Sequence, residues 1–167
     1  MKFISFLNRG VASYGAVIGQ DDVVDLLPQL GARAADLKTL IAQDLLAEAA
    51  RLAQASQPTL KLSQLALLPV IPNPGKIVCV GLNYGEHVRE TGREITESPA
   101  LFLRLPDSQV GHGQDIVRPP ESHRLDYEAE IAVVIGKGGR RIKEEDAWDH
   151  IAGYSCYNDG SVRDWQV

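Results

Sequence analysis

Residues 125–136 read Leu-Asp-Tyr-Glu-Ala-Glu-Ile-Ala-Val-Val-Ile-Gly, and within them residues 126–136 have the strongest strand pattern in the sequence. Successive side chains of a strand point to opposite faces, so Glu128 and Glu130 share one face with Ala132 and Val134. Both faces become apolar within a few residues. The pattern therefore predicts a strand that is buried on both sides, with two carboxylates near its start.

Two carboxylates on one buried face repel each other and take up protons unless a positive group neutralises them. A hard divalent cation with a preference for oxygen ligands would do this. A solvated strand end is the alternative for Glu128 and Glu130. Asp159 ends a second predicted strand and precedes Gly160. It is either a further ligand at the edge of a sheet or part of an ordinary turn.

His87 and Glu90 lie three residues apart, so on one turn of helix they face the same way. A carboxylate beside an imidazole fixes its tautomer and raises its basicity, which favours a general base for water. A surface His–Glu pair is the alternative interpretation. The sequence contains neither the zinc-protease spacing nor a nucleophile elbow, so it does not support covalent serine or cysteine hydrolysis.

The sequence divides near a segment rich in proline. Residues 1–72 predict a small α+β unit, with strands over 3–7 and 12–18 and a helix whose apolar stripe comprises Leu37, Leu40, Ile41, Leu45, Leu46 and Leu52. Three prolines and a glycine between 69 and 75 mark the boundary to a second domain over 73–167. In that domain, residues 143–151 predict a helix capped by Gly153.

Composition excludes several classes of protein. A net charge of -5 argues against a nucleic-acid surface, and no stretch approaches the roughly 20 apolar residues that cross a bilayer. Cys79 and Cys156 each lie in an apolar segment, which predicts two buried thiols. A reducing cytoplasm fits such cysteines best.

Three stretches together resemble the fumarylacetoacetate hydrolase (FAH) family. They are residues 78–84 with His87 and Glu90, residues 125–130 with 133–137, and residues 153–154 with Asn158-Asp159 and 163–166. The resemblance covers about Lys76 to Gln166. It implies an α+β fold in which the first part of a mixed β-sandwich roll follows the small amino-terminal domain, and it implies a homodimer.

The resemblance also assigns the site residues. Glu128, Glu130 and Asp159 would bind Mg²⁺ or Mn²⁺, with Ca²⁺ as a third candidate, and His87 with Glu90 would be the acid–base pair. Arg104 would hold a substrate carboxylate, although many relatives carry lysine there, and Asn83 and Tyr84 would also contact the substrate. Relatives continue well beyond the position of Val167, so we expect the chain to be the front part of a longer protein.

The predicted function is metal-dependent hydrolysis of a carbon–carbon bond in a 1,3-diketo or 2-oxo acid of the acylpyruvate or fumarylpyruvate kind. The metal would hold the small-molecule oxo acid, and His87 would activate water. Two alternatives share the metal: an isomerase or decarboxylase of oxo-dioates from aromatic catabolism, and a lyase of the ureidoglycolate type. A further alternative is a non-catalytic fragment of such an enzyme.

Overall fold

The computed structural model describes residues 1–85, 89 and 98–166 of the chain. It contains helices and antiparallel sheets, which confirms the α+β prediction. The chain forms two compact units, one comprising Met1–Ile71 with Val110–Val167 and the other Pro72–Gln109. The first boundary lies one residue from the predicted division, but the chain returns to the first unit at Val110. The division into 1–72 and 73–167 therefore stays a prediction.

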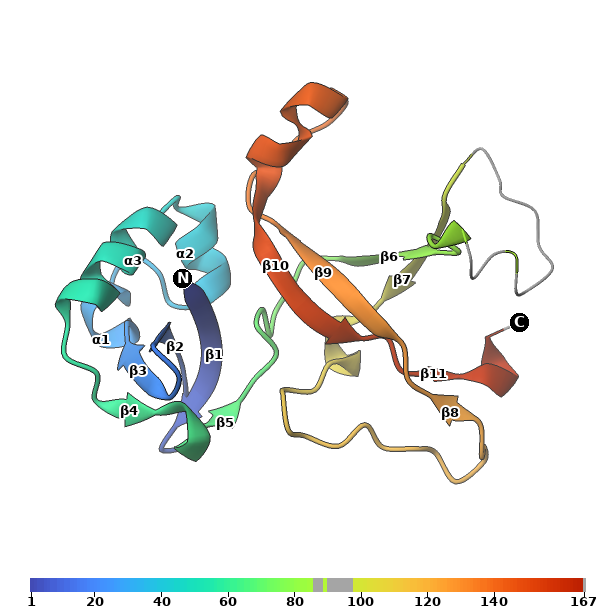
Figure 1. Cartoon of the computed structure of the whole chain (residues 1–167), viewed down its shortest axis with the longest axis horizontal. Helices are drawn as coiled ribbons and strands as arrows, with labels where there is room; N and C mark the ends of the chain where they lie inside the picture. Colours follow the sequence, from blue (N-terminus) through green and yellow to red (C-terminus); the bar gives the residue numbers. More distant parts are fainter. Residues whose placement is uncertain (86–88, 90–97, 167) are drawn as a thin grey trace. The chain divides into compact units, whose positions relative to one another are not determined.

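The amino-terminal part is built on a five-stranded antiparallel sheet with the strand order β4-β3-β2-β1-β5 (Figure 1). Its strands are β1 (Lys2–Asn8), β2 (Val11–Ile18), β3 (Asp22–Asp25), β4 (Leu60–Lys61) and β5 (Ala66–Leu67). A tight turn joins β1 to β2, where Arg9 and Gly10 both adopt positive φ angles. Glycine adopts this conformation without strain, so Gly10 favours the hairpin.

Three short helices pack against this sheet: α1 (Leu27–Leu30), α2 (Leu37–Ala42) and α3 (Leu46–Ala55). The predicted single helix is divided into α2 and α3, because Asp44 takes a φ of 56° and ends the helical path. The predicted apolar stripe nevertheless reaches the core, where Leu37 and Leu40 are buried with Tyr14. The apolar stripe is confirmed, and the backbone break at Asp44 is the difference from the prediction.

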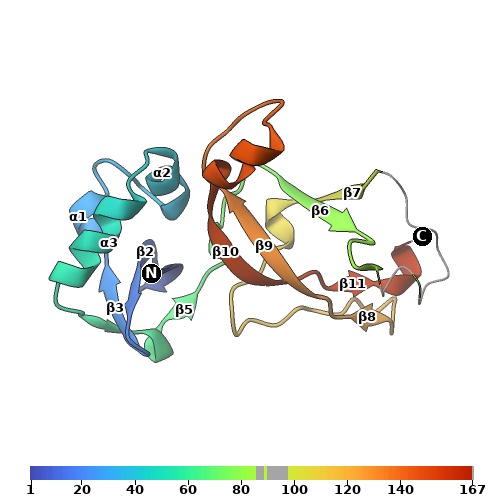
Figure 2. The same ribbon diagram turned by 45° about the horizontal axis from the view of Figure 1, so that its top comes forward.

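The carboxyl-terminal part of the first unit contains two antiparallel pairs of strands. β9 (Ala129–Ile135) pairs with β10 (Ile151–Asn158) in a long curved ladder, which Figure 2 shows well. β8 (Leu125–Asp126) pairs with β11 (Ser161–Val162). The single strand predicted over 126–136 is therefore divided into β8 and β9 by a break at residues 127–128.

The second unit contains one antiparallel pair, β6 (Ile77–Gly81) with β7 (Ala100–Arg104). Short 3₁₀ turns complete the described chain: η1 (Leu62–Gln64), η2 (Pro106–Ser108), η3 (Glu144–His150) and η4 (Arg163–Trp165). No helix among the described residues is long and apolar enough to span a membrane.

Three expectations from the sequence are wrong. Residues 144–150 form the 3₁₀ segment η3 instead of an α-helix, and Gly153 lies inside β10 at a shift in register instead of capping a helix. The β9 strand is buried on neither face: one face is half-buried, and on the other Ile131 and Ile135 are 68% and 62% exposed. Cys156 lies on that exposed face, and Cys79 is only half-buried.

The core of the amino-terminal part contains a buried hydrogen bond whose removal has a predictable cost. The Tyr14 hydroxyl donates to the Ala34 carbonyl at 2.8 Å, and Tyr14 is 1% exposed. Tyr14→Phe leaves that carbonyl without its donor, so we expect a loss of about 1–3 kcal/mol in the free energy of unfolding, measured with urea.

The control for this substitution is Lys61→Gln. It removes an ion pair with Asp22 whose side chains are 51% and 47% exposed, so its effect should stay within about 0–1 kcal/mol. If both variants lost the same free energy of unfolding, the Tyr14 hydrogen bond would contribute no more than an exposed ion pair. That result would contradict this prediction.

Candidate metal centre

Glu128 lies in the break between β8 and β9, and its backbone is held by the end of β10. Its N–H donates to the Asn158 Oδ1 atom at 3.0 Å, and its carbonyl accepts the N–H of Asp159 at 2.9 Å. The side chain of Asn158 thus replaces one backbone partner of the ladder. These two hydrogen bonds join the segment of Glu128 directly to that of Asp159.

The register of the ladder brings the three predicted ligands to one end. Glu130 pairs with Tyr157, and Ala129 pairs with Asn158. Directly opposed residues share a face, and residues two apart on a strand do so too. Glu130 therefore lies on the half-buried face of β9, and the hydrogen bond between the Asp159 N–H and the Glu128 carbonyl continues the pairing beyond the last pair of the ladder. Asp159 is the most buried of the three acids, at 5% exposure.

Arg163, in η4, lies against this group of acids. Its Nη1 atom donates to Glu128 Oε1 at 2.5 Å and to Gln166 Oε1 at 2.8 Å. Its Nε and Nη2 atoms both donate to Asp126 Oδ2, at 3.1 and 2.9 Å. The guanidinium therefore bridges a carboxylate of β8 and the carboxylate of Glu128.

These contacts shift the pKa values of Asp126 and Arg163. The hydrogen bond from Arg163 lowers the pKa of Asp126, and desolvation offsets part of this effect. Partial burial lowers the pKa of Arg163, but its hydrogen bonds to Asp126 and Glu128 outweigh burial and leave that pKa raised. Both groups are therefore charged across the whole neutral range.

A second set of contacts fixes the β8–β11 pair beside the acids. The Ser122 hydroxyl donates to Asp164 Oδ2 at 2.5 Å, and Arg124 Nη1 forms an ion pair with Asp164 Oδ1 at 3.2 Å. The backbone N–H of Arg163 donates to the carbonyl of Arg124 at 3.0 Å. Ser122 is 2% exposed, so this junction is well packed at its centre.

The donor set suits a hard divalent cation, because carboxylate oxygens are the ligands that Mg²⁺, Mn²⁺ and Ca²⁺ prefer. Within the described residues, however, no three His, Cys, Asp or Glu side chains are gathered closely enough to hold a metal ion. The backbone thus brings the three acids to one place, while the side chain of Glu128 turns to Arg163. Their role as a ligand set stays a prediction.

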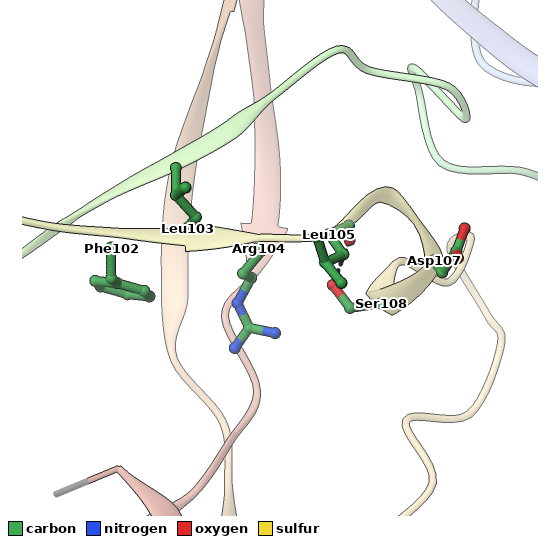
Figure 3. Close-up of a pocket in the computed structure, with 6 residues that line it drawn as sticks. All are labelled: Phe102, Leu103, Arg104, Leu105, Asp107 and Ser108. Atoms are coloured by element: carbon green, nitrogen blue, oxygen red, sulfur yellow. Dashed lines mark hydrogen bonds between the residues drawn. The ribbon is translucent and has the colours of Figure 1, made fainter.

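The predicted substrate-binding residues lie in the second unit. Arg104 ends β7 and lines an open depression of about 540 Å³ with Phe102, Leu103, Leu105, Asp107 and Ser108. Figure 3 shows Phe102 and Arg104 on one side of β7 and Leu103 on the other. Asn83 and Tyr84 follow β6, directly after Leu82 with its φ of 55°, and both are exposed. His87 and Glu90 lie outside the described residues.

Reasoning from the sequence missed the bridge made by Arg163 and Asp126. Both residues occur in the stretches that carry the family resemblance, but neither received a role. Their separation of 37 positions gives no local signal, because only the pairing of β8 with β11 brings them together.

Comparisons with known proteins agree with this geometry. A sequence profile of the fumarylacetoacetate (FAA) hydrolase C-terminal domain matches residues 76–167. The mitochondrial oxaloacetate tautomerase fahd2 of Xenopus laevis is 46% identical over 112 residues, which are 67% of this chain and 35% of that protein. The chain thus spans about a third of the length of that relative.

Two solved structures share the fold. A probable 2-hydroxyhepta-2,4-diene-1,7-dioate isomerase from Mycobacterium abscessus has a TM-score of 0.74 and 34% identity, over 98% of this chain and 54% of that one. The maleylpyruvate hydrolase from Sphingobium sp. SYK-6, in complex with manganese(II) and pyruvate, has a TM-score of 0.77 and 27% identity, over 98% of this chain and 60% of that one. The chain therefore belongs to the fumarylacetoacetate hydrolase family.

Proposed function

We propose that the protein is part of a divalent-metal-dependent enzyme that acts on a 2-oxo acid through its enol form. The observation that carries this proposal is the convergence of Glu128, Glu130 and Asp159 at one end of the β9–β10 ladder. The maleylpyruvate hydrolase with manganese and pyruvate supports both the metal and the class of substrate.

Among the reactions of this class, we favour tautomerisation of a dicarboxylic 2-oxo acid. The support is the 46% identity, over 112 residues, to an oxaloacetate tautomerase. A bound cation would act as a Lewis acid that stabilises negative charge on the oxygen of the 2-oxo group. The carboxylates of this chain would hold that cation, and their half-buried position would limit its exchange with water.

Carbon–carbon bond hydrolysis, the reaction predicted from the sequence, is the second candidate. It needs a base that activates water, and His87 oriented by Glu90 is the predicted base. Tautomerisation needs a group that moves a proton between carbon and oxygen of the substrate, but it needs no attack by water. The two candidates therefore share the metal ligands and differ in whether water is activated.

The remaining expectations also stand as proposals. They are substrate contacts from Arg104, Asn83 and Tyr84, a small-molecule oxo acid as the binding partner, a homodimer without nucleic-acid or membrane partners, and a cytoplasmic location. The Xenopus relative carries the description mitochondrial, so the location is the proposal for which a fractionation experiment is most informative.

Calorimetric titration with Mn²⁺ tests the metal ligands. We expect Glu128→Gln, Glu130→Gln and Asp159→Asn each to weaken binding by more than the roughly 10–100-fold loss typical of a residue that only supports a ligand. The control is Glu145→Gln, whose carboxylate pairs with Lys143 and is 73% exposed. Unchanged affinity in Glu128→Gln and Glu130→Gln would refute the site.

A comparison of two assays separates the two candidate reactions. We expect the protein to accelerate loss of the oxaloacetate enol absorbance, and we expect a chelator to abolish that acceleration. In parallel, release of pyruvate from acylpyruvates measures hydrolysis. If hydrolysis occurs, His87→Ala should abolish it while Mn²⁺ affinity survives, because the imidazole acts on water and binds no metal. Cleavage that persists unchanged in His87→Ala would refute the assignment of the base.

A further inference from the structure

We propose that Asp126 and Arg163 form a positioning pair that orients Glu128 for cation binding, an inference that rests on the proposed metal site. Neither residue is a ligand in this scheme. Arg163 acts through the carboxylate of Glu128, and Asp126 acts through the guanidinium of Arg163. The argument starts from the geometry of this bridge.

The Glu128–Arg163 contact is more buried than the ion pairs Arg33–Glu48 and Lys143–Glu145. Its two side chains are 26% and 28% exposed, whereas the pairs Arg33–Glu48 and Lys143–Glu145 have side chains 38% exposed or more. Exposed pairs contribute little, because water screens them and both side chains lose entropy. A half-buried, charge-assisted hydrogen bond is stronger and more directional.

Asp126 explains why the guanidinium keeps its orientation. Two nitrogens, Nε and Nη2, donate to the same oxygen of Asp126, which holds one edge of the guanidinium against that carboxylate. Because the group is rigid and planar, fixing one edge also fixes the direction of Nη1. Nη1 is the atom that donates to Glu128 Oε1.

Glu128 needs such support because of where it lies in the backbone. It occupies the break between β8 and β9, outside the regular ladder that holds Glu130. A carboxylate has two oxygens, so Oε1 can accept from Arg163 while Oε2 serves a cation. Residues that orient a ligand in this way commonly raise metal affinity.

The charges agree with this division of roles. The carboxylates of Glu128, Glu130, Asp159 and Asp126 with the guanidinium of Arg163 carry a net charge of -3, which a divalent cation reduces to -1. Arg163 also lowers the repulsion among the three acids before a cation arrives. The opposite role, in which Arg163 occupies the cation's place and must be displaced, predicts the opposite effect on affinity, so the two roles are separable by experiment.

The test is calorimetric titration of the whole chain with Mn²⁺ alone. We expect Arg163→Gln to raise the Kd by about 10–100-fold, and Asp126→Asn to raise it less. The double variant should bind no more weakly than Arg163→Gln, since Asp126 acts only through Arg163. Arg33→Gln is the matched control: it removes a guanidinium that pairs with Glu48 in the amino-terminal part, and its Kd should equal that of the unmodified chain.

Arg163→Lys separates orientation from charge, and thermal unfolding of each variant checks that it is folded. An ammonium keeps the charge but cannot hold both carboxylates in a fixed fork, so its Kd should lie between those of the unmodified chain and Arg163→Gln. If Arg163→Gln fails to fold, the Kd of Arg163→Lys decides, and an unchanged value overturns the proposal.

Three results would overturn the positioning pair while leaving the proposed function intact: unchanged affinity in Arg163→Gln, tighter binding in Arg163→Gln, or independent losses from the two substitutions. Failure of the unmodified chain to bind Mn²⁺ is a different result. It would refute the metal site itself.

Discussion

At the end of the β9–β10 ladder, Asn158 and Asp159 bind the backbone of Glu128, one through an amide oxygen and the other through its N–H. An isolated pair of glutamates on a strand can face solvent at no cost. These two hydrogen bonds join the segment of Glu128 to that of Asp159, which is 5% exposed. The proposed ligand set therefore depends on two hydrogen bonds to the backbone of Glu128.

The acids at this end of the ladder favour a positive charge nearby, and Arg163 supplies one. Arg163 reaches these acids from η4, only four residues beyond Asp159, because the turn after β10 leads back along β8. The same short stretch of sequence thus supplies both an acid and a cation to the site.

Local patterns in the sequence were sufficient for part of this arrangement. Alternation placed Glu128 and Glu130 on one face, and the strand before Asp159 was recognised. The sequence does not predict the break at residues 127–128, because Tyr127 and Glu128 continue an unbroken strand pattern. The amide of Asn158, which binds the Glu128 N–H, is 30 residues away in the sequence. Asp126 and Arg163 meet only in the folded chain, so no periodic pattern in the sequence predicts their contact.

The helices, too, could be predicted from the sequence only in part. The leucine stripe indicated which residues enter the core, since burial follows from apolar periodicity. It did not indicate that Asp44 interrupts the backbone, or that residues 144–150 wind as a 3₁₀ segment. Such details depend on a few dihedral angles and on packing, which side-chain type constrains weakly.

The outer face of the β9–β10 ladder affects how the protein behaves in solution. Ile131, Val133, Ile135 and Tyr154 form a strip there whose members are 47–68% exposed. A contiguous apolar strip beside open strand edges favours self-association as concentration rises. Sulfate and other strongly excluded salts would strengthen that tendency, and fluorescent dyes that bind apolar surfaces would label the folded chain.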